Sequence, residues 1–279
     1  LVVVPLVFGP AVSHAEDGQP IDLSGLARVV VHPDAVRLTG RHERQRLVVT
    51  GMTSAGDDGP RWDLGRLARY EAVPAGVVEV TAGGELIARR SGTAVVRVTF
   101  GKVHSEVRVT VRDGETFRPV NFTNDINPLL TRLGCNGGSC HGKSNGRGGF
   151  RLSLFGHHPE WDFEWITQGG RGRRIFSAAP DRSLLLRKPT MQMPHGGGRR
   201  MSVDSDAYRL VRRWVREGAR WGEVDVAKLQ RIEVFPSEAT VRSGHSQQLV
   251  VTAVYDDGTR RDVSRVVELR TNDSSLVEI

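Results

Sequence analysis

This 279-residue chain is poor in several residue types, and each shortage excludes something. It has two cysteines, Cys135 and Cys140, so it is not a scaffold held together by many disulfides. Aromatic residues make up 6% of the chain, and no pair of base-stacking aromatics accompanies the basic residues. Lysine is scarce beside arginine, a bias that reflects a GC-rich coding sequence more often than a nucleic-acid site. We therefore expect no nucleic-acid partner, whereas the net charge of +7 suits an acidic protein partner.

Long hydrophobic runs are also missing, and after residue 15 nothing is apolar for long enough to cross a membrane. Residues 1–15, LVVVPLVFGPAVSHA, carry no Asp, Glu, Lys or Arg and end in small residues. This pattern is typical of a secretory signal and its cleavage site, with a buried first strand as the alternative. We expect an exported protein, periplasmic or associated with the cell surface, with a linker over residues 16–25 and no transmembrane segment.

An internal repeat sets the expected architecture. Residues 45–52, QRLVVTGM, recur almost unchanged as residues 247–254, QQLVVTAV. Both copies alternate apolar and polar residues over short runs, the period of strands with one buried face. The copies resemble the group 2 bacterial immunoglobulin-like (Ig-like) family, which implies β-sandwiches that act as spacer or adhesive modules. We place the first over residues 26–113 and the second over residues 226–279, where it is C-terminally truncated because the sequence is part of a longer protein.

Both cysteines lie in one short stretch, CNGGSCHG at residues 135–142, in which His141 directly follows Cys140. Two nearby thiols followed by a histidine are what covalent haem attachment requires, since the thiols add to the haem vinyl groups and the imidazole ligates the iron. The cysteines are separated by four residues rather than the usual two. A local disulfide between Cys135 and Cys140 is the alternative interpretation.

The segment around this motif differs in character from the repeats. A capping Thr123 or Asn124 predicts a helix before the motif, and apolar residues at helical spacing predict a second helix over residues 206–219. One helix before the motif and one at the end is the order of a small c-type cytochrome. We therefore expect residues 114–225 to form a mostly α cytochrome c-like domain, between an all-β Ig-like sandwich and a truncated Ig-like sandwich.

This central segment resembles the planctomycete-type cytochrome c family. The matching stretches occur in order and are DINPLL, GCNGGSCHGKSNGRGGFRLSLFG, GRGRRIFSAAPDRSLLLRKPT, MPHGGGRR and RRWVREGA. The resemblance implies a haem c domain in which Cys135 and Cys140 hold the cofactor and His141 is the proximal ligand.

The second axial ligand has two main candidates. Met193 precedes a proline about 50 residues after His141, where c-type cytochromes commonly place a methionine ligand, and Met191 is close enough to substitute. His195 is the rival, because the glycines at 196–198 leave its backbone free to approach the iron. The arginines at 171, 173 and 174 suit the two haem propionates geometrically.

Three classes of function follow from these residues. The first is an exported electron-transfer module that exchanges electrons with an acidic redox partner and makes no substrate bond. The second is a structural or adhesive surface protein with a Cys135–Cys140 disulfide and no haem. The third is a haem enzyme or sensor with an open distal site. We predict the first, an electron carrier rather than an enzyme.

Overall fold

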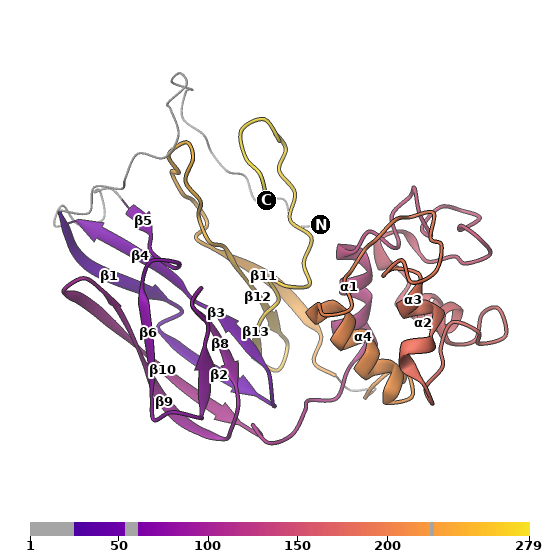
Figure 1. The fold of residues 1–279 in the computed structure, drawn as a ribbon, viewed down its shortest axis with the longest axis horizontal. Helices are drawn as coiled ribbons and strands as arrows, with labels where there is room; N and C mark the ends of the chain where they lie inside the picture. Colours follow the sequence, from indigo (N-terminus) through magenta and orange to yellow (C-terminus); the bar gives the residue numbers. More distant parts are fainter. Residues whose placement is uncertain (1–24, 54–60, 224–225) are drawn as a thin grey trace. The chain divides into compact units, whose positions relative to one another are not determined.

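The computed structural model describes residues 25–53, 61–223 and 226–279, so the predicted signal at 1–15 lies outside the described residues. Contacts divide the chain into two compact units (Figure 1). The β unit contains the described residues up to Arg118 together with Lys228–Ser264, and the central unit contains those of Pro119–Ala227 with Arg265–Ile279. Among the described residues, no helix has both the length and the apolar character needed to cross a bilayer.

The first repeat contributes ten described strands to the β unit. Their bounds are β1 (Leu26–His32), β2 (Ala35–Thr39), β3 (Arg44–Arg46), β4 (Val48–Thr53), β5 (Arg61–Asp63), β6 (Arg69–Val73), β7 (Val78–Val80), β8 (Glu85–Ala88), β9 (Gly92–Phe100) and β10 (Val103–Arg112). They pair in the orders β1-β4-β5, β2-β10-β9-β6 and β3-β8-β7, and all pairs are antiparallel except β2 with β10.

Alternation of side chains explains the core of these sheets. In β9 the side chains of Ala94, Val96 and Val98 are buried while those between them are exposed. Successive side chains of a strand point to opposite faces, so this period places one row of β9 against the core. Val96 and Val98 join Leu47, Leu64 and other buried side chains in a single apolar cluster.

The second repeat adds three described strands, β11 (Leu229–Phe235), β12 (Val250–Tyr255) and β13 (Arg260–Asp262), paired in that order. They match β1, β4 and β5 in register: Val48 faces His32 as Val250 faces Phe235, and Thr50 faces Asp63 as Thr252 faces Asp262.

The two repeats contact each other through equivalent residues. The Oδ2 atom of Asp262 accepts a hydrogen bond from the backbone N–H of Arg46 at 2.6 Å, and Asp63 accepts one from Gln248, the counterpart of Arg46. The rings of His32 and Phe235, also counterparts, stack with centroids 3.8 Å apart. Because equivalent residues of the two repeats make the same contacts, the repeats are related by a local pseudo-twofold axis.

The central unit contains four described α-helices, α1 (Asn127–Arg132), α2 (Pro159–Thr167), α3 (Leu184–Arg187) and α4 (Asp206–Arg216). A π-helical turn at Phe122–Ile126 leads into α1, and 3₁₀ turns lie at Leu154–Gly156 and Pro180–Arg182. The first helical turn begins earlier than the sequence predicts, because the side chain of Asn121 caps it by accepting the N–H of Asn124 at 2.9 Å.

The expected mostly α cytochrome c-like domain is wrong. In the part of the chain that the structure describes, β-sheet exceeds helix, and the four described α-helices have only 6, 9, 4 and 11 residues, joined by long turns. Glycine and proline explain the shortness, because glycine costs a helix about 1 kcal/mol and proline about 3 kcal/mol relative to alanine. The stretch between α1 and α2 alone has glycines at 134, 137, 138, 142, 146, 148, 149 and 156.

An aromatic core holds these short elements together. The side chains of Phe122 and Trp214 are almost completely buried, and their ring centroids lie 5.6 Å apart. The side chain of Ser205 caps α4 by accepting the N–H of Tyr208 at 3.2 Å. Tertiary packing rather than helix length therefore stabilises the central unit.

Candidate functional site

The loop that follows α1 presents both cysteines and the adjacent histidine together. The N–H of Cys135 donates to the Leu130 carbonyl at 2.9 Å, which joins the loop to the end of α1. The N–H of His141 donates to the Cys135 carbonyl at 3.0 Å, and the N–H of Leu152 donates to the His141 carbonyl at 2.8 Å. These bonds fix the backbone of the motif on both sides of His141.

Gly142 lies so close to the backbone of Asn136 that no side chain fits at this position. A Cβ atom at Gly142 would lie 1.9 Å from the Asn136 carbonyl oxygen, and a backbone atom cannot move away cheaply. We expect Gly142→Ala to destabilise the central unit by about 1–3 kcal/mol, as overpacking does. Gly138→Ala is the control, since a Cβ there meets only a Leu154 carbon at 3.8 Å. Urea denaturation of both variants measures the difference, and equal midpoints would contradict the argument.

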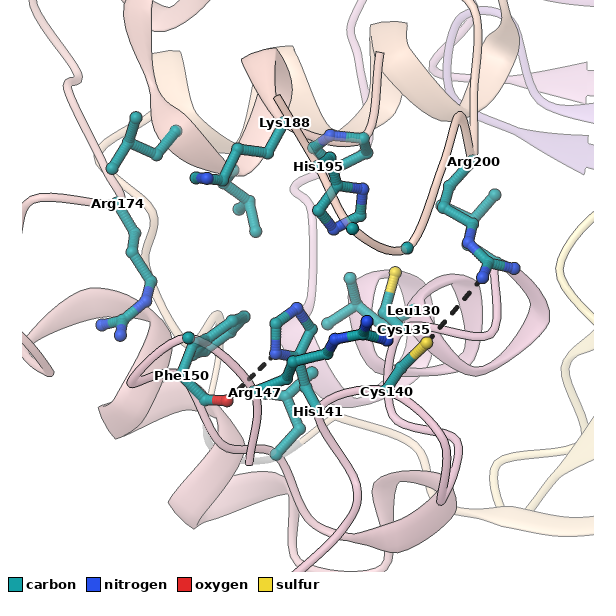
Figure 2. Close-up of a pocket in the computed structure, with 18 of the residues that line it drawn as sticks. Leu130, Cys135, Cys140, His141, Arg147, Phe150, Arg174, Lys188, His195 and Arg200 are labelled. Carbon is teal, nitrogen blue, oxygen red and sulfur yellow. Dashed lines mark hydrogen bonds between the residues drawn. The ribbon is translucent and has the colours of Figure 1, made fainter. Parts of the chain in front are cut away.

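The motif opens onto a cavity of about 190 Å³. Its apolar wall comes from α1, α3, α4 and the loop after the motif, and its polar residues include Cys135, Cys140, His141 and His195 (Figure 2). The apolar lining residues are Leu130, Leu133, Phe150, Leu152, Leu184, Leu185, Pro189, Met201 and Val211.

His141 has the tautomer of a metal ligand. Its Nδ1 atom lies 3.0 Å from the Phe150 carbonyl oxygen, which can only accept, so Nδ1 carries the proton and Nε2 carries the lone pair. Burial lowers the pKa of His141, and the nearby His195 lowers it further. The imidazole is therefore neutral near pH 7, as metal binding requires.

His195 mirrors this arrangement from the opposite side of the cavity. Its Nδ1 atom lies 2.8 Å from the Gly198 carbonyl oxygen, so its lone pair also lies on Nε2. The two rings face each other across the cavity in Figure 2, with centroids 6.3 Å apart and planes inclined by 21°.

This separation matches one metal ion shared by two imidazoles. A ring nitrogen lies roughly 1 Å from its centroid and bonds a transition metal at about 2 Å, so two trans imidazoles on one metal have centroids about 6 Å apart. A backbone carbonyl that fixes the tautomer is also the usual outer contact of a ligating histidine. His141 and His195 are therefore the pair of residues at this cavity that could hold a metal ion.

The two cysteines are free thiols at the same cavity, Cys140 buried and Cys135 half-buried. Burial raises the pKa of the Cys135 thiol to about 12, against the opposing influence of Arg200. An Nη2 atom of Arg200 lies 3.8 Å from the Cys140 sulfur (Figure 2). Arg200 is thus placed to stabilise developing negative charge on a sulfur that reacts.

The charged residues that line the cavity are all basic. They are Arg147, Arg173, Arg174, Lys188 and Arg200, and no aspartate or glutamate lines it. The guanidinium of Arg174 already donates to the Trp165 and Gly149 carbonyls at 3.0 and 2.9 Å, so its role is largely structural. The others favour a ligand that carries negative charge at its edge.

The structure brings together Cys135, Cys140, His141 and His195, but Met193 is not among the residues that line the cavity. The N–H of Met193 donates to the Arg187 carbonyl at 3.2 Å. Of the three arginines suggested for propionates, those at 173 and 174 line the cavity and the one at 171 does not.

Sequence reasoning gave no role to Arg147, Lys188, Arg200 or Met201, which line the cavity. The first three lie inside stretches that resemble the cytochrome family, and no pattern marked Met201. Within the described parts of the chain, no group of three or more His, Cys, Asp or Glu side chains is arranged to hold a metal ion.

Comparison of the chain with known proteins gives no assignment. No protein-family model matches it, and neither does any curated protein.

Proposed function

We propose that the central unit binds one haem c and carries electrons for an exported protein. The observation that carries the proposal is the pair of opposed imidazoles, 6.3 Å apart, at a cavity that also holds both thiols. On this proposal the repeats are Ig-like spacers, the redox partner is an acidic protein, and the protein is periplasmic or held at the cell surface. The ordered motifs that resemble the planctomycete-type cytochrome c family support the same function.

Each residue of the site has a defined task in this proposal. The thiols of Cys135 and Cys140 would hold the haem as thioethers, since addition of S–H across a vinyl double bond needs no oxidant. His141 and His195 would each offer an Nε2 lone pair to the iron. The bound group supplies an iron that cycles between the ferrous and ferric states.

The cavity wall suits both the apolar ring of a haem and its charged propionates. The leucines and Phe150 provide a dry apolar surface, while Arg173 and Lys188 are cations for the two propionates. The volume of about 190 Å³ is below the roughly 300–1,000 Å³ of ordinary ligand pockets. A porphyrin edge would therefore extend beyond the walls, and thioether bonds retain a group that a shallow cavity cannot enclose.

Two axial histidines favour electron transfer over catalysis. If His195 completes the coordination, no open position remains for a peroxide or another small substrate. The loss or gain of an electron then changes no ligand, which keeps reorganisation small. We therefore place the electron carrier ahead of the haem enzyme or sensor.

Intact mass and the pyridine haemochrome spectrum test the proposal. We expect protein exported in a host with the haem-attachment machinery to be heavier than its chain by one haem and to give a bis-thioether spectrum. Cys135→Ala and Cys140→Ala should each leave a single thioether and lower the haem content severalfold. The double variant should carry no covalent haem.

The control is wild-type protein produced without the attachment machinery, which should have the mass of the bare chain. If fully matured wild-type protein also has only that mass, the haem proposal is wrong. A mass lower by two hydrogen atoms would instead indicate the Cys135–Cys140 disulfide of a structural protein.

A further inference from the structure

A second cavity, of about 700 Å³, is lined by residues that follow His141 and by the start of α2. Its lining includes Lys143, Arg151, Leu154, Phe155, His158 and Trp161. It is distinct from the proposed haem site, since only Leu152 lines both cavities.

The centre of this groove is apolar and exposed. Leu154, Phe155 and Trp161 are 48%, 51% and 48% exposed. Phe155 has a positive φ of 54°, which is unfavourable for a bulky residue, and its N–H donates to the Asn136 carbonyl at 3.2 Å. The fold therefore holds an aromatic ring in solvent at an energetic cost, which is common at functional sites.

The rim of the groove is positive. Lys143 and Arg151 line it, and no aspartate or glutamate does. Two acids of α2 flank the lining residue Trp161 in sequence. Asp162 is buried and accepts from the hydroxyl of Ser153 at 2.7 Å. Glu160 is exposed but lies outside the lining. An apolar centre with cations at its edge is the usual form of a transient interface, in which the charges steer an oppositely charged partner.

The groove is also close to the iron-ligating residue along the chain. Gly142 and Lys143 directly follow His141, and Leu152, which lines both cavities, donates its N–H to the His141 carbonyl at 2.8 Å. A partner seated here would be separated from the haem by little more than the loop.

We propose that this groove docks an acidic redox protein whose contact surface has an apolar centre ringed by carboxylates. The proposal rests on the proposed haem function, and it names the surface through which the electron passes. One electron leaves the partner's reduced centre and converts ferric to ferrous haem, and no atom is transferred.

Flavodoxin in its hydroquinone form, an acidic one-electron donor, is the probe. We expect Lys143→Glu/Arg151→Glu to weaken flavodoxin binding roughly tenfold or more at low salt and to slow haem reduction in proportion. The charge-matched control is Lys102→Glu/Arg108→Glu, at exposed positions of the β unit, which should change neither. Trp161→Ala should weaken binding at both low and high salt, because it removes apolar area rather than charge.

Three readouts keep this test separate from that of the haem proposal. Haem content and reduction by dithionite, a small reductant, should be equal in all variants, and calorimetric binding of flavodoxin does not depend on haem turnover. Wild-type protein without haem defeats the proposed function. Two results would defeat the docking proposal alone, provided that haem content and dithionite reduction are normal. One is equal flavodoxin affinity in the two double variants, and the other is no flavodoxin binding by wild type. If Arg151→Glu impairs folding, Lys143→Glu by itself carries the test.

Discussion

His195→Ala should open the iron to external ligands, whereas Met193→Ala should leave it closed. The imidazole of His195 faces that of His141 across the cavity, and its Nδ1 atom is bound to the Gly198 carbonyl 2.8 Å away. Met193 does not line the cavity. On the proposed function, removing the His195 imidazole therefore removes an iron ligand, whereas removing the Met193 thioether does not.

The expected size of the effect follows from competition. In the wild type, carbon monoxide binds only to molecules in which His195 has dissociated from the iron. For a conformational equilibrium of a few kcal/mol, this minor state has a population of roughly 0.1–10%. Apparent affinity falls by that fraction, so His195→Ala should bind carbon monoxide roughly 10- to 1,000-fold more tightly than wild type. Titration of the ferrous protein followed by visible absorption measures this. His195→Met should raise the reduction potential, because a thioether favours ferrous iron.

Met193→Ala is the matched control, because it alters the same loop two residues away. A sulfur-to-iron charge-transfer band in the ferric wild-type spectrum that disappears in Met193→Ala would reverse the assignment. If the band survives in that variant and disappears in Met201→Ala, the ligand is Met201, which lines the cavity.

The sequence is sufficient to predict the cysteines and His141 of the candidate site, but not to choose between His195 and Met193. Cys135, Cys140 and His141 are adjacent in the chain, so their proximity follows from covalent connection alone. His195 and Met193 are both plausible by position, and no pattern says which side chain turns inward. That choice depends on the turn at Gly198, which has a positive φ of 73° and offers its carbonyl to the His195 ring. Such a turn is a tertiary feature.

The fold divides in a similar way. The alternating residues of 92–100 predict a strand, and β9 has these bounds; the helical spacing of Leu210, Val211, Trp214 and Val215 predicts a helix, and α4 contains them. The mostly α prediction failed because it extended two terminal helices over a glycine-rich segment. What holds that segment is side-chain hydrogen bonding and loop closure, as where the Nδ2 atom of Asn136 donates to the Thr131 hydroxyl at 2.9 Å. Periodicity does not register such bonds.

The repeat reveals that two segments are alike but not that they touch. Asp63 and Asp262 are equivalent by sequence, yet each bonds the backbone of the opposite copy. These reciprocal bonds form only because a strand end of one repeat packs against the equivalent strand end of the other. That packing is a property of the folded β unit and cannot be read from the sequence.

Trp214→Ala should lower the free energy of unfolding of the central unit by about 3–5 kcal/mol, the usual range for a buried tryptophan. The side chain is 1% exposed, its rings pack against Phe122 and Phe163, and its Nε1 atom donates to the Arg220 carbonyl at 2.7 Å. Truncation leaves a large cavity and a carbonyl without its donor. Since domains are stable by only about 5–15 kcal/mol, haem attachment should fall as well.

Trp161→Ala is the matched control, because the same side chain on α2 is 48% exposed and contacts mainly the His158 ring. We expect its effect on stability to stay near 0.5 kcal/mol, as for ordinary surface positions. Urea denaturation followed by far-ultraviolet circular dichroism distinguishes the two variants. Equal midpoints would mean that the aromatic cluster around Trp214 does not hold the central unit together. A large loss confined to Trp214→Ala would show that the short helices, each too short to persist alone, are held in place by that cluster and carry the haem-binding loop with them.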